Sequence, residues 1–113
     1  MKQVWLLRGG DVLASAEVAE AWGDRVRGLL GHSTYEGALL LKGTRSVHSV
    51  GMRFALDVAF LRRDLTIVAT SRLRPWGLAL PRRGGCHVLV AEAGAFERWH
   101  LGVGDQVEIR EPW

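Results

Sequence analysis

The pattern of apolar and polar residues along the chain predicts mostly short β-strands. Apolar residues at 4–7 and 12–14 flank a turn at 9–11. This turn contains two glycines, which readily adopt the positive φ angles of a tight β-hairpin. Further apolar runs of strand length are bounded by glycine, proline or charged residues, and they cover 38–41, 56–61, 65–70, 87–91 and 106–110. Such short, evenly spaced strands predict a mainly β fold, either a compact β-sandwich or a distorted barrel of short antiparallel strands with one or two short helices.

The segment after the first turn fits two periodicities. Residues 12–18 alternate as a strand, whereas the apolar residues from Val18 to Leu30 recur at helical spacing. We expect the strand to run to about Val18 and a short helix to cover roughly 21–30. Gly31 is the natural C-terminal stop of that helix.

Chain length and composition predict one soluble domain over residues 1–113. The chain is 48% hydrophobic and 24% charged, and no stretch approaches the roughly 20 apolar residues of a membrane span. The apolar run at the start ends at Leu7, and Asp11 follows, which does not fit a signal peptide. We therefore expect a cytoplasmic protein with no membrane partner. A lone Cys86 excludes an internal disulfide, and the four histidines lack the paired spacing of structural zinc, so no cofactor is predicted.

Positive charge is concentrated in one region. Residues 62–83 hold six arginines against Asp64 alone, a local charge of +5 in a chain whose total is +3. Arginine could recognise phosphate or carboxylate groups. Since thirteen of the fifteen basic residues are arginine, we interpret most of this enrichment as compositional bias.

One candidate chemical group is His48, Met52, Arg53 and Asp57. An imidazole and a carboxylate nine residues apart across a turn could orient a general base, and Cys86 beside His87 could add a nucleophile. The structural interpretation is favoured: Asp57 accepts bonds from backbone N–H groups or Arg53, Met52 fills the core and His48 holds a loop. For Cys86 we expect a small apolar role.

The string His48-Ser-Val-Gly-Met-Arg-Phe-Ala-Leu-Asp57-Val-Ala-Phe60 resembles the signature of a bacterial and archaeal family, domain of unknown function 192. Arg25-Val-Arg27-Gly28-Leu29-Leu30 resembles a second motif of that family. Residues 93–105, with Gly94, Gly104 and Asp105, resemble its closing motif, in which a short helix leads to a Gly-Asp turn. The resemblance covers nearly the whole chain, and the fold that it implies agrees with the predicted one.

The chain departs from the family at two places. The turn at 62–64 lacks the usual glycine, and residues 89–94 replace the usual Leu-Glu-x-Pro-Ala-Gly, so that a glutamate with a role in relatives is either absent here or moved to Glu92. Arg25, Arg27 and Gly28 have two open interpretations. In the favoured one, an arginine is buried against a carboxylate such as Asp57; in the other, the arginines form an anion clamp with Arg53.

The loop at 72–83 has its own alternatives. Arg72, Arg74, Arg82 and Arg83 with Trp76 are the residue types that bind single-stranded nucleic acid through phosphate contacts and stacking. One tryptophan and four arginines fall short of such a fingerprint, so nucleic acid is disfavoured. We expect a solvated loop with Trp76 packed over the end of the barrel. The tryptophans at 5, 22, 76, 99 and 113 are interpreted as core and rim packing, with a partner surface as an alternative for Trp113.

These observations favour a non-enzymatic binding or accessory domain. Its expected ligand is a protein segment or a small anionic molecule near His48, Met52, Arg53, Asp57, Arg74 and Trp76. The alternatives are a small hydrolase or transferase that uses His48 and Asp57 with Cys86, and anion or nucleic-acid binding through the 72–83 loop.

Overall fold

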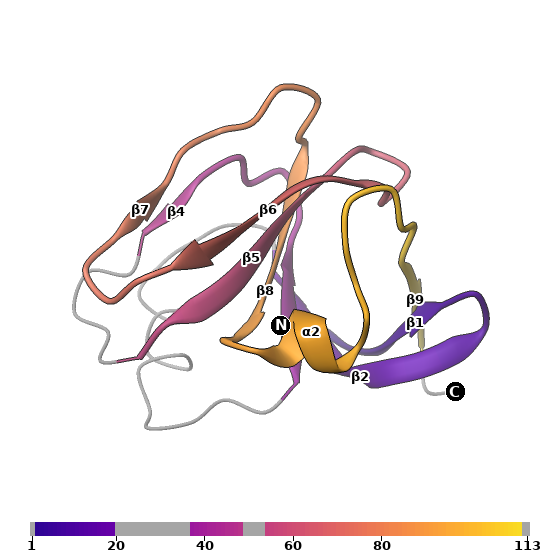
Figure 1. Ribbon diagram of the computed structural model, residues 1–113. Coiled ribbons are helices and arrows are strands. Elements are labelled where there is room, and N and C mark those ends of the chain that lie inside the picture. Colours follow the sequence, from indigo (N-terminus) through magenta and orange to yellow (C-terminus); the bar gives the residue numbers. More distant parts are fainter. Residues whose placement is uncertain (1, 20–36, 49–53, 112–113) are drawn as a thin grey trace.

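A computed structural model describes residues 2–19, 37–48 and 54–111. Its main sheet has seven strands in the order β6-β5-β8-β3-β2-β1-β9. Their bounds are β1 Lys2–Arg8, β2 Asp11–Ala19, β3 Ala38–Leu41, β5 Leu56–Leu61, β6 Ile67–Leu73, β8 His87–Glu92 and β9 Glu108–Arg110. A second sheet pairs β4, Val47–His48, with β7, Leu78–Ala79, and the helix α2 covers Ala95–Arg98 (Figure 1).

The mainly β fold is confirmed, with two differences in detail. Five of the six neighbouring pairs in the main sheet are antiparallel, but β2 and β3 are parallel, with Ala16 opposite Ala38. A parallel pair requires a crossover connection, which the periodicity of the strands does not reveal. Within the described residues the sheet curls without closing into a barrel. An isolated bridge between Thr66 and Gln106, with neighbouring backbone hydrogen bonds, links the segments next to the two edges.

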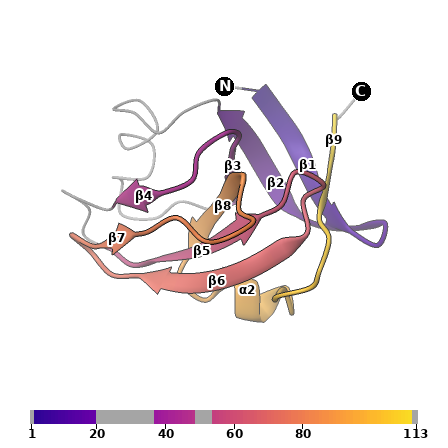
Figure 2. The same cartoon turned by 90° about the horizontal axis from the view of Figure 1, so that it is seen from above.

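The main sheet is apolar on both faces because its central strands are covered on both sides. Every residue of β3 and β5 is buried. On β5, Ala59 and Leu61 face a core that includes Phe96 of α2. Val58 and Phe60 face the opposite core, which includes Val47 of β4 and Ala79 of β7. The helix and the β4–β7 sheet therefore cover opposite faces, as Figures 1 and 2 show.

Most predicted elements occur where expected. The predicted strands at 38–41 and 56–61 match β3 and β5, and the first hairpin matches β1 and β2. The strand predicted at 65–70 is displaced, since β6 covers Ile67–Leu73. The loop predicted at 72–83 contains the short strand β7. The helix predicted at roughly 21–30 lies outside the described residues.

Candidate functional site

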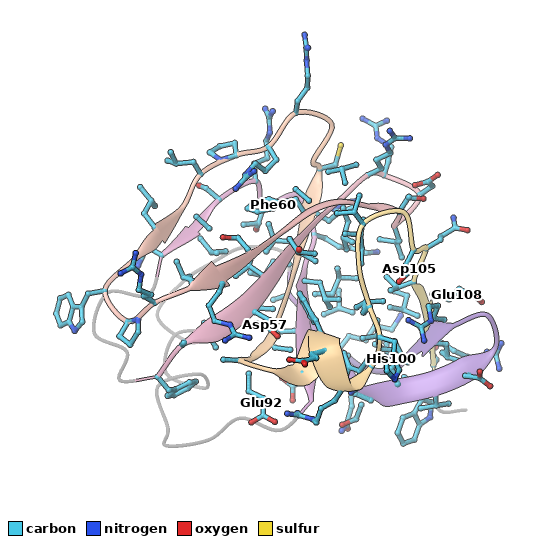
Figure 3. The ribbon with its side chains drawn as sticks, viewed as in Figure 1. Asp57, Phe60, Glu92, His100, Asp105 and Glu108 are labelled. Atoms are coloured by element: carbon cyan, nitrogen blue, oxygen red, sulfur yellow. The ribbon has the colours of Figure 1, made fainter. Side chains whose placement is uncertain are left out.

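Asp57 is a buried carboxylate that holds α2 against the sheet. It lies at the start of β5 and is 5% exposed. One carboxylate oxygen accepts hydrogen bonds from the backbone N–H groups of Gly94 and Phe96, at 2.9 and 3.1 Å. The other accepts a bond from Nε of Arg72 at 3.0 Å (Figure 3). Because the first turn of a helix has N–H groups without intrahelical acceptors, Asp57 supplies from a distant strand the cap that α2 lacks locally.

Arg72 is the arginine that pairs with Asp57 among the described residues. The two residues stand directly opposite each other in the β5–β6 pairing. The sequence predicts Arg53 or one of the arginines at 25 and 27 as the partner, and all three lie outside the described residues. Cross-strand register is the signal that points to Arg72, since directly opposed residues share one face.

The proposed catalytic groups are not brought together. Asp57 lies on the face of the sheet that α2 covers, whereas His48 lies on β4, which packs against the opposite face. Cys86 precedes β8 and donates its backbone N–H to the carbonyl of Leu61, at the far end of β5 from Asp57. Its Sγ atom lies 3.8 Å from the carbonyl oxygen of Gly84. A set of Cys86, His48 and Asp57 therefore has no common centre.

The candidate ligand residues divide into three groups. His48 of β4 stands opposite Leu78 of β7, on the same side of the molecule as Arg74 and Trp76. Asp57 is separate, on the α2 side. Met52 and Arg53 lie outside the described residues, as do the structural candidates Arg25, Arg27 and Gly28.

Trp76 does not pack over the end of a barrel, as the sequence analysis expected. Its residue surface is 70% exposed. It occupies a turn closed by a hydrogen bond from the Gly77 N–H to the Arg74 carbonyl, at 3.0 Å. The backbone φ of Trp76 is 61°, so the side chain is directed by a left-handed turn instead of an extended strand. The tryptophans therefore have different roles: Trp99 packs against the core, whereas Trp76 faces solvent.

The closing motif ties the C-terminal segment to the sheet. Gly94 and Gly104 both have φ near 94°, which glycine adopts without steric cost. Asp105 accepts a hydrogen bond from the Gly102 N–H at 2.9 Å. Its backbone carbonyl accepts one from the Ile67 N–H at 2.8 Å. These contacts hold the turn at residues 102–105 beside the start of β6.

A polar cavity of about 290 Å³ lies on the α2 side. It is lined by Asp57, Thr70, Ser71, Arg72, Phe96, Glu97 and Leu101. The carboxylate oxygens of Asp57 are already engaged by two backbone donors and an arginine. The Asp57 carboxylate in this cavity therefore serves to stabilise the fold.

A larger, basic cavity of about 460 Å³ lies at the opposite end of β5. Its lining consists of Gly43, Arg45, Arg63, Gly84, Gly85, Cys86 and His87. The Gly43 N–H donates to Nδ1 of His87 at 2.9 Å and so connects the turn after β3 to the start of β8. This bond requires an unprotonated Nδ1, which assigns the proton of the neutral imidazole to Nε2.

The Arg82–Gly85 turn forms one wall of this basic cavity. A bond from the Gly85 N–H to the Arg82 carbonyl, at 2.9 Å, closes the turn. Gly84 has a φ of 83°, and a Cβ on Gly85 would lie 3.1 Å from the Arg82 carbonyl oxygen. The Arg82 guanidinium lies over the Phe60 ring, 5.5 Å from its centroid. Two arginines of this cavity, Arg45 and Arg63, were not identified as binding candidates from sequence.

Asp64, in the turn between β5 and β6, has a perturbed carboxyl group. A hydrogen bond from the Thr66 backbone N–H, 3.0 Å long, holds the pKa of Asp64 below its ordinary value of 3.8. A bond from the Thr66 side chain and the charge of Arg62 lower the pKa further. The turn thus carries an exposed carboxylate that is stabilised in its charged form.

The described part of the chain offers neither a cluster of metal-binding side chains nor a helix that could span a membrane. Within it, no group of three or more histidine, cysteine, aspartate or glutamate side chains is placed to hold a metal ion. None of its helices is both long enough and apolar enough to cross a membrane.

The fold and these sites define a small, mainly β domain in which a buried aspartate caps a short helix. Residues 5–109 match domain of unknown function 192, described as an uncharacterized ACR, and the chain belongs to this family. The chain is similar to UPF0127 protein PF1050 of Pyrococcus furiosus, with 35% identity over 56% of the chain. It is also similar to UPF0127 protein PYRAB11210 of Pyrococcus abyssi, with 32% identity over the same share. The match spans 54% of each relative's length.

Two solved structures share the fold. One, from Sinorhizobium meliloti 1021, is described as a candidate transcription regulator; its TM-score is 0.74 at 21% identity, over 96% of this chain and 92% of that one. The other, from Novosphingobium aromaticivorans DSM 12444, is a protein of unknown function; its TM-score is 0.71 at 19% identity, over 94% and 83% of the two chains. At these identities the likeness shows the fold alone.

Proposed function

We propose that the chain is a non-catalytic binding domain that holds a small anionic ligand in the basic cavity. The observation that carries the proposal is the lining of that cavity. Arg45 comes from the connection between β3 and β4, and Arg63 comes from the turn between β5 and β6. None of the residues that line the cavity in the described part of the chain is acidic. Two guanidinium groups from separate segments suit a ligand with phosphate or carboxylate groups.

The size and construction of the cavity support this proposal. A volume of about 460 Å³ falls within the range of small-molecule sites. The Gly43–His87 hydrogen bond joins segments 44 residues apart and so fixes two walls relative to each other. Gly84 is exposed at the cavity and has no side chain, so its backbone is open to a close approach by the ligand. A preorganised site of this kind loses little entropy on binding.

The separation of the candidate catalytic groups supports the non-catalytic part of the proposal. A nucleophile and its base must lie within hydrogen-bond reach, about 2.6–3.2 Å, or be bridged by one water. Asp57 is engaged by the backbone of α2, and Cys86 lies at the other end of β5. The proposal includes the cytoplasmic, one-domain setting that the sequence predicts, in which Cys86 stays reduced.

Thermal unfolding with inorganic phosphate and with citrate tests the proposal, at an ionic strength held constant with sodium chloride. A ligand that binds the native state raises the melting temperature by mass action. We expect both anions to stabilise the wild-type chain, and the double variant Arg45→Gln, Arg63→Gln to lose this stabilisation. Each substitution should weaken binding about tenfold or more, because it removes a charge-assisted hydrogen bond. Arg110→Gln, at the far edge of the sheet, is the matched control.

An equal response of the double variant and the wild type would exclude the cavity as the site. A short single-stranded oligonucleotide is the further probe, because one structural neighbour is described as a candidate transcription regulator. Tight oligonucleotide binding that falls steeply with salt, with no response to phosphate or citrate, would mean that the ligand is nucleic acid and not a small anion.

A further inference from the structure

An exposed apolar ridge runs along β7, and none of its residues lines the basic cavity. We define the β7 ridge as Arg74, Trp76, Leu78 and Leu80. Trp76 is 70% exposed, Leu78 63% and Leu80 62%. In Figures 1 and 2 the segment from the end of β6 through β7 lies along an outer edge of the molecule. Three large apolar side chains within five residues of chain, from Trp76 to Leu80, form a patch of the kind that marks an interaction surface.

The two leucines of the ridge share one face because of the strand alternation. Ala79 of β7 is buried and packs with Val47 of β4 in the core. Leu78 therefore points to the outer face, and its directly opposed partner is His48. The alternation that buries Ala79 leaves Leu80 exposed as well. The leucines thus line the outside of the β4–β7 sheet.

Trp76 occupies a backbone position that does not favour tryptophan. Arg74 and Gly77 close a four-residue turn by a hydrogen bond of 3.0 Å, with Pro75 second and Trp76 third. The φ of 61° at the third position is one that glycine or asparagine adopts most readily. A bulky residue there is a steric outlier, and its side chain gains little burial in return. The fold therefore gives no reason for a tryptophan at this position.

The positive charges around the ridge favour a negatively charged partner. Residues 65–91 contain no acidic residue. Arg74 lies at one end of the ridge, and Arg82 and Arg83 follow its other end, all of them exposed. An arginine-flanked edge carrying tryptophan and leucine matches the interface of a bilayer with anionic headgroups, where aromatic rings sit at headgroup depth.

We propose that the β7 ridge docks the domain peripherally on an anionic lipid surface. Trp76 and the two leucines enter the headgroup region, and the three arginines contact lipid phosphates. A lipid surface is favoured over an acidic peptide because three exposed large apolar side chains stand between exposed arginines on an outer edge of the molecule. This contact revises the expectation of no membrane partner, and it requires no membrane-spanning helix, which the described residues do not contain.

Co-sedimentation with lipid vesicles tests the proposal. One set of vesicles contains phosphatidylcholine alone, and the other contains equal parts of phosphatidylcholine and phosphatidylglycerol. We expect the chain to bind the second set and not the first. Trp76→Gly and the double variant Leu78→Ser, Leu80→Ser should each weaken binding about tenfold or more, through lost apolar burial. Neutralising each of the three arginines to glutamine should weaken it about fivefold.

Val103→Ser is the matched control, because Val103 is 66% exposed but lies in the turn beside the start of β6. It should bind as the wild type does. Each variant's unfolding midpoint is measured in parallel, so that a folding defect is recognised. The proposed anion site is independent of this test, since Arg45→Gln with Arg63→Gln leaves the ridge intact.

Three results would overturn the proposal. The first is an absence of binding to both vesicle sets. The second is binding that depends on the arginines but is unchanged in Trp76→Gly and in the leucine variant, which would mean charge attraction without insertion. The third is binding of another partner while vesicles remain unbound. The partners tested are a single-stranded oligonucleotide, polyglutamate and, by sedimentation velocity, a second copy of the chain. Such binding would count against the lipid surface if Trp76→Gly abolishes it. In that case the ridge would belong to a macromolecular partner.

Discussion

The α2 side of the sheet and the β7 ridge both carry charged and aromatic side chains, but the two regions use them differently. On the α2 side, Asp57 is buried and each of its oxygens accepts a bond from the protein. On the ridge, Trp76 and two leucines are exposed, and Trp76 has an unfavourable backbone angle. Polar groups satisfied within the chain indicate a role in stability. Apolar groups exposed at some cost to stability indicate a partner.

Replacing Asp57 is the most damaging change expected from this comparison. Asp57→Ala leaves the backbone N–H groups of Gly94 and Phe96 without their acceptor, and it removes the partner of Arg72. We expect the free energy of unfolding to fall by about 3 kcal/mol, since a buried unsatisfied donor costs about 1–3 kcal/mol. Urea denaturation measures this loss. Asp57→Asn, which keeps one acceptor oxygen, should lose less, and an alanine variant as stable as the wild type would refute the capping role.

Gly77→Ala tests whether the ridge turn has a defined backbone. A Cβ at this position would lie 2.8 Å from the Arg74 carbonyl oxygen and 3.0 Å from Cδ1 of Leu73. The turn must shift to relieve these contacts, and we expect a loss of about 2 kcal/mol. Gly102→Ala is the control, because a Cβ there meets no atom within 4 Å. Equal stability of the two variants would show that the turn adapts freely.

Arg72→Ala separates the two kinds of bond that Asp57 accepts. The Arg72 side chain is 57% exposed, so its ion pair is screened by solvent. We expect a loss below about 1 kcal/mol, which is the range for exposed pairs. Measured by the same urea denaturation, a loss equal to that of Asp57→Ala would mean that the arginine, and not the helix backbone, is the main partner.

Asp64 provides an exposed carboxylate to compare with Asp57. Its pKa is lower in the folded state, so its contribution to stability is present above the unfolded value of 3.8. That contribution is lost as the pH falls from 3.8 through the folded pKa. We expect Asp64→Asn to be slightly less stable than the wild type at pH 7 and to match it in strong acid. A difference that does not change with pH would assign the effect to the turn geometry.

The sequence predicts the central strands better than the peripheral ones. β3 and β5 are apolar runs between turn residues and are buried on both faces, so their pattern follows directly from burial. β6 extends to Leu73 because the edge strand accommodates Ser71, which is half-buried, and Arg72, which is exposed, although both look like loop residues. β4 and β7 have two residues each, which is too short for a periodicity. Their pairing depends on tertiary contacts.

The candidate sites were predicted only in part, for a physical reason. Asp57 stood out as a polar residue in an apolar run, but its main donors are backbone N–H groups, one of them 39 residues away, and these carry no residue-type signal. Trp76 was expected to pack because tryptophan usually does. Its exposure follows from a turn whose geometry depends on Pro75 and Gly77 together. Arg45 and Arg63 meet at one cavity only through the fold.

The unfolding free energy of Trp76→Gly tests most directly whether the ridge serves a partner instead of the fold. Glycine adopts a φ of 61° without strain, and the exposed indole contributes little burial. The variant should therefore be as stable as the wild type or more stable, by up to about 1 kcal/mol. A loss of more than about 1 kcal/mol would contradict the account, because it would show that Trp76 stabilises the fold.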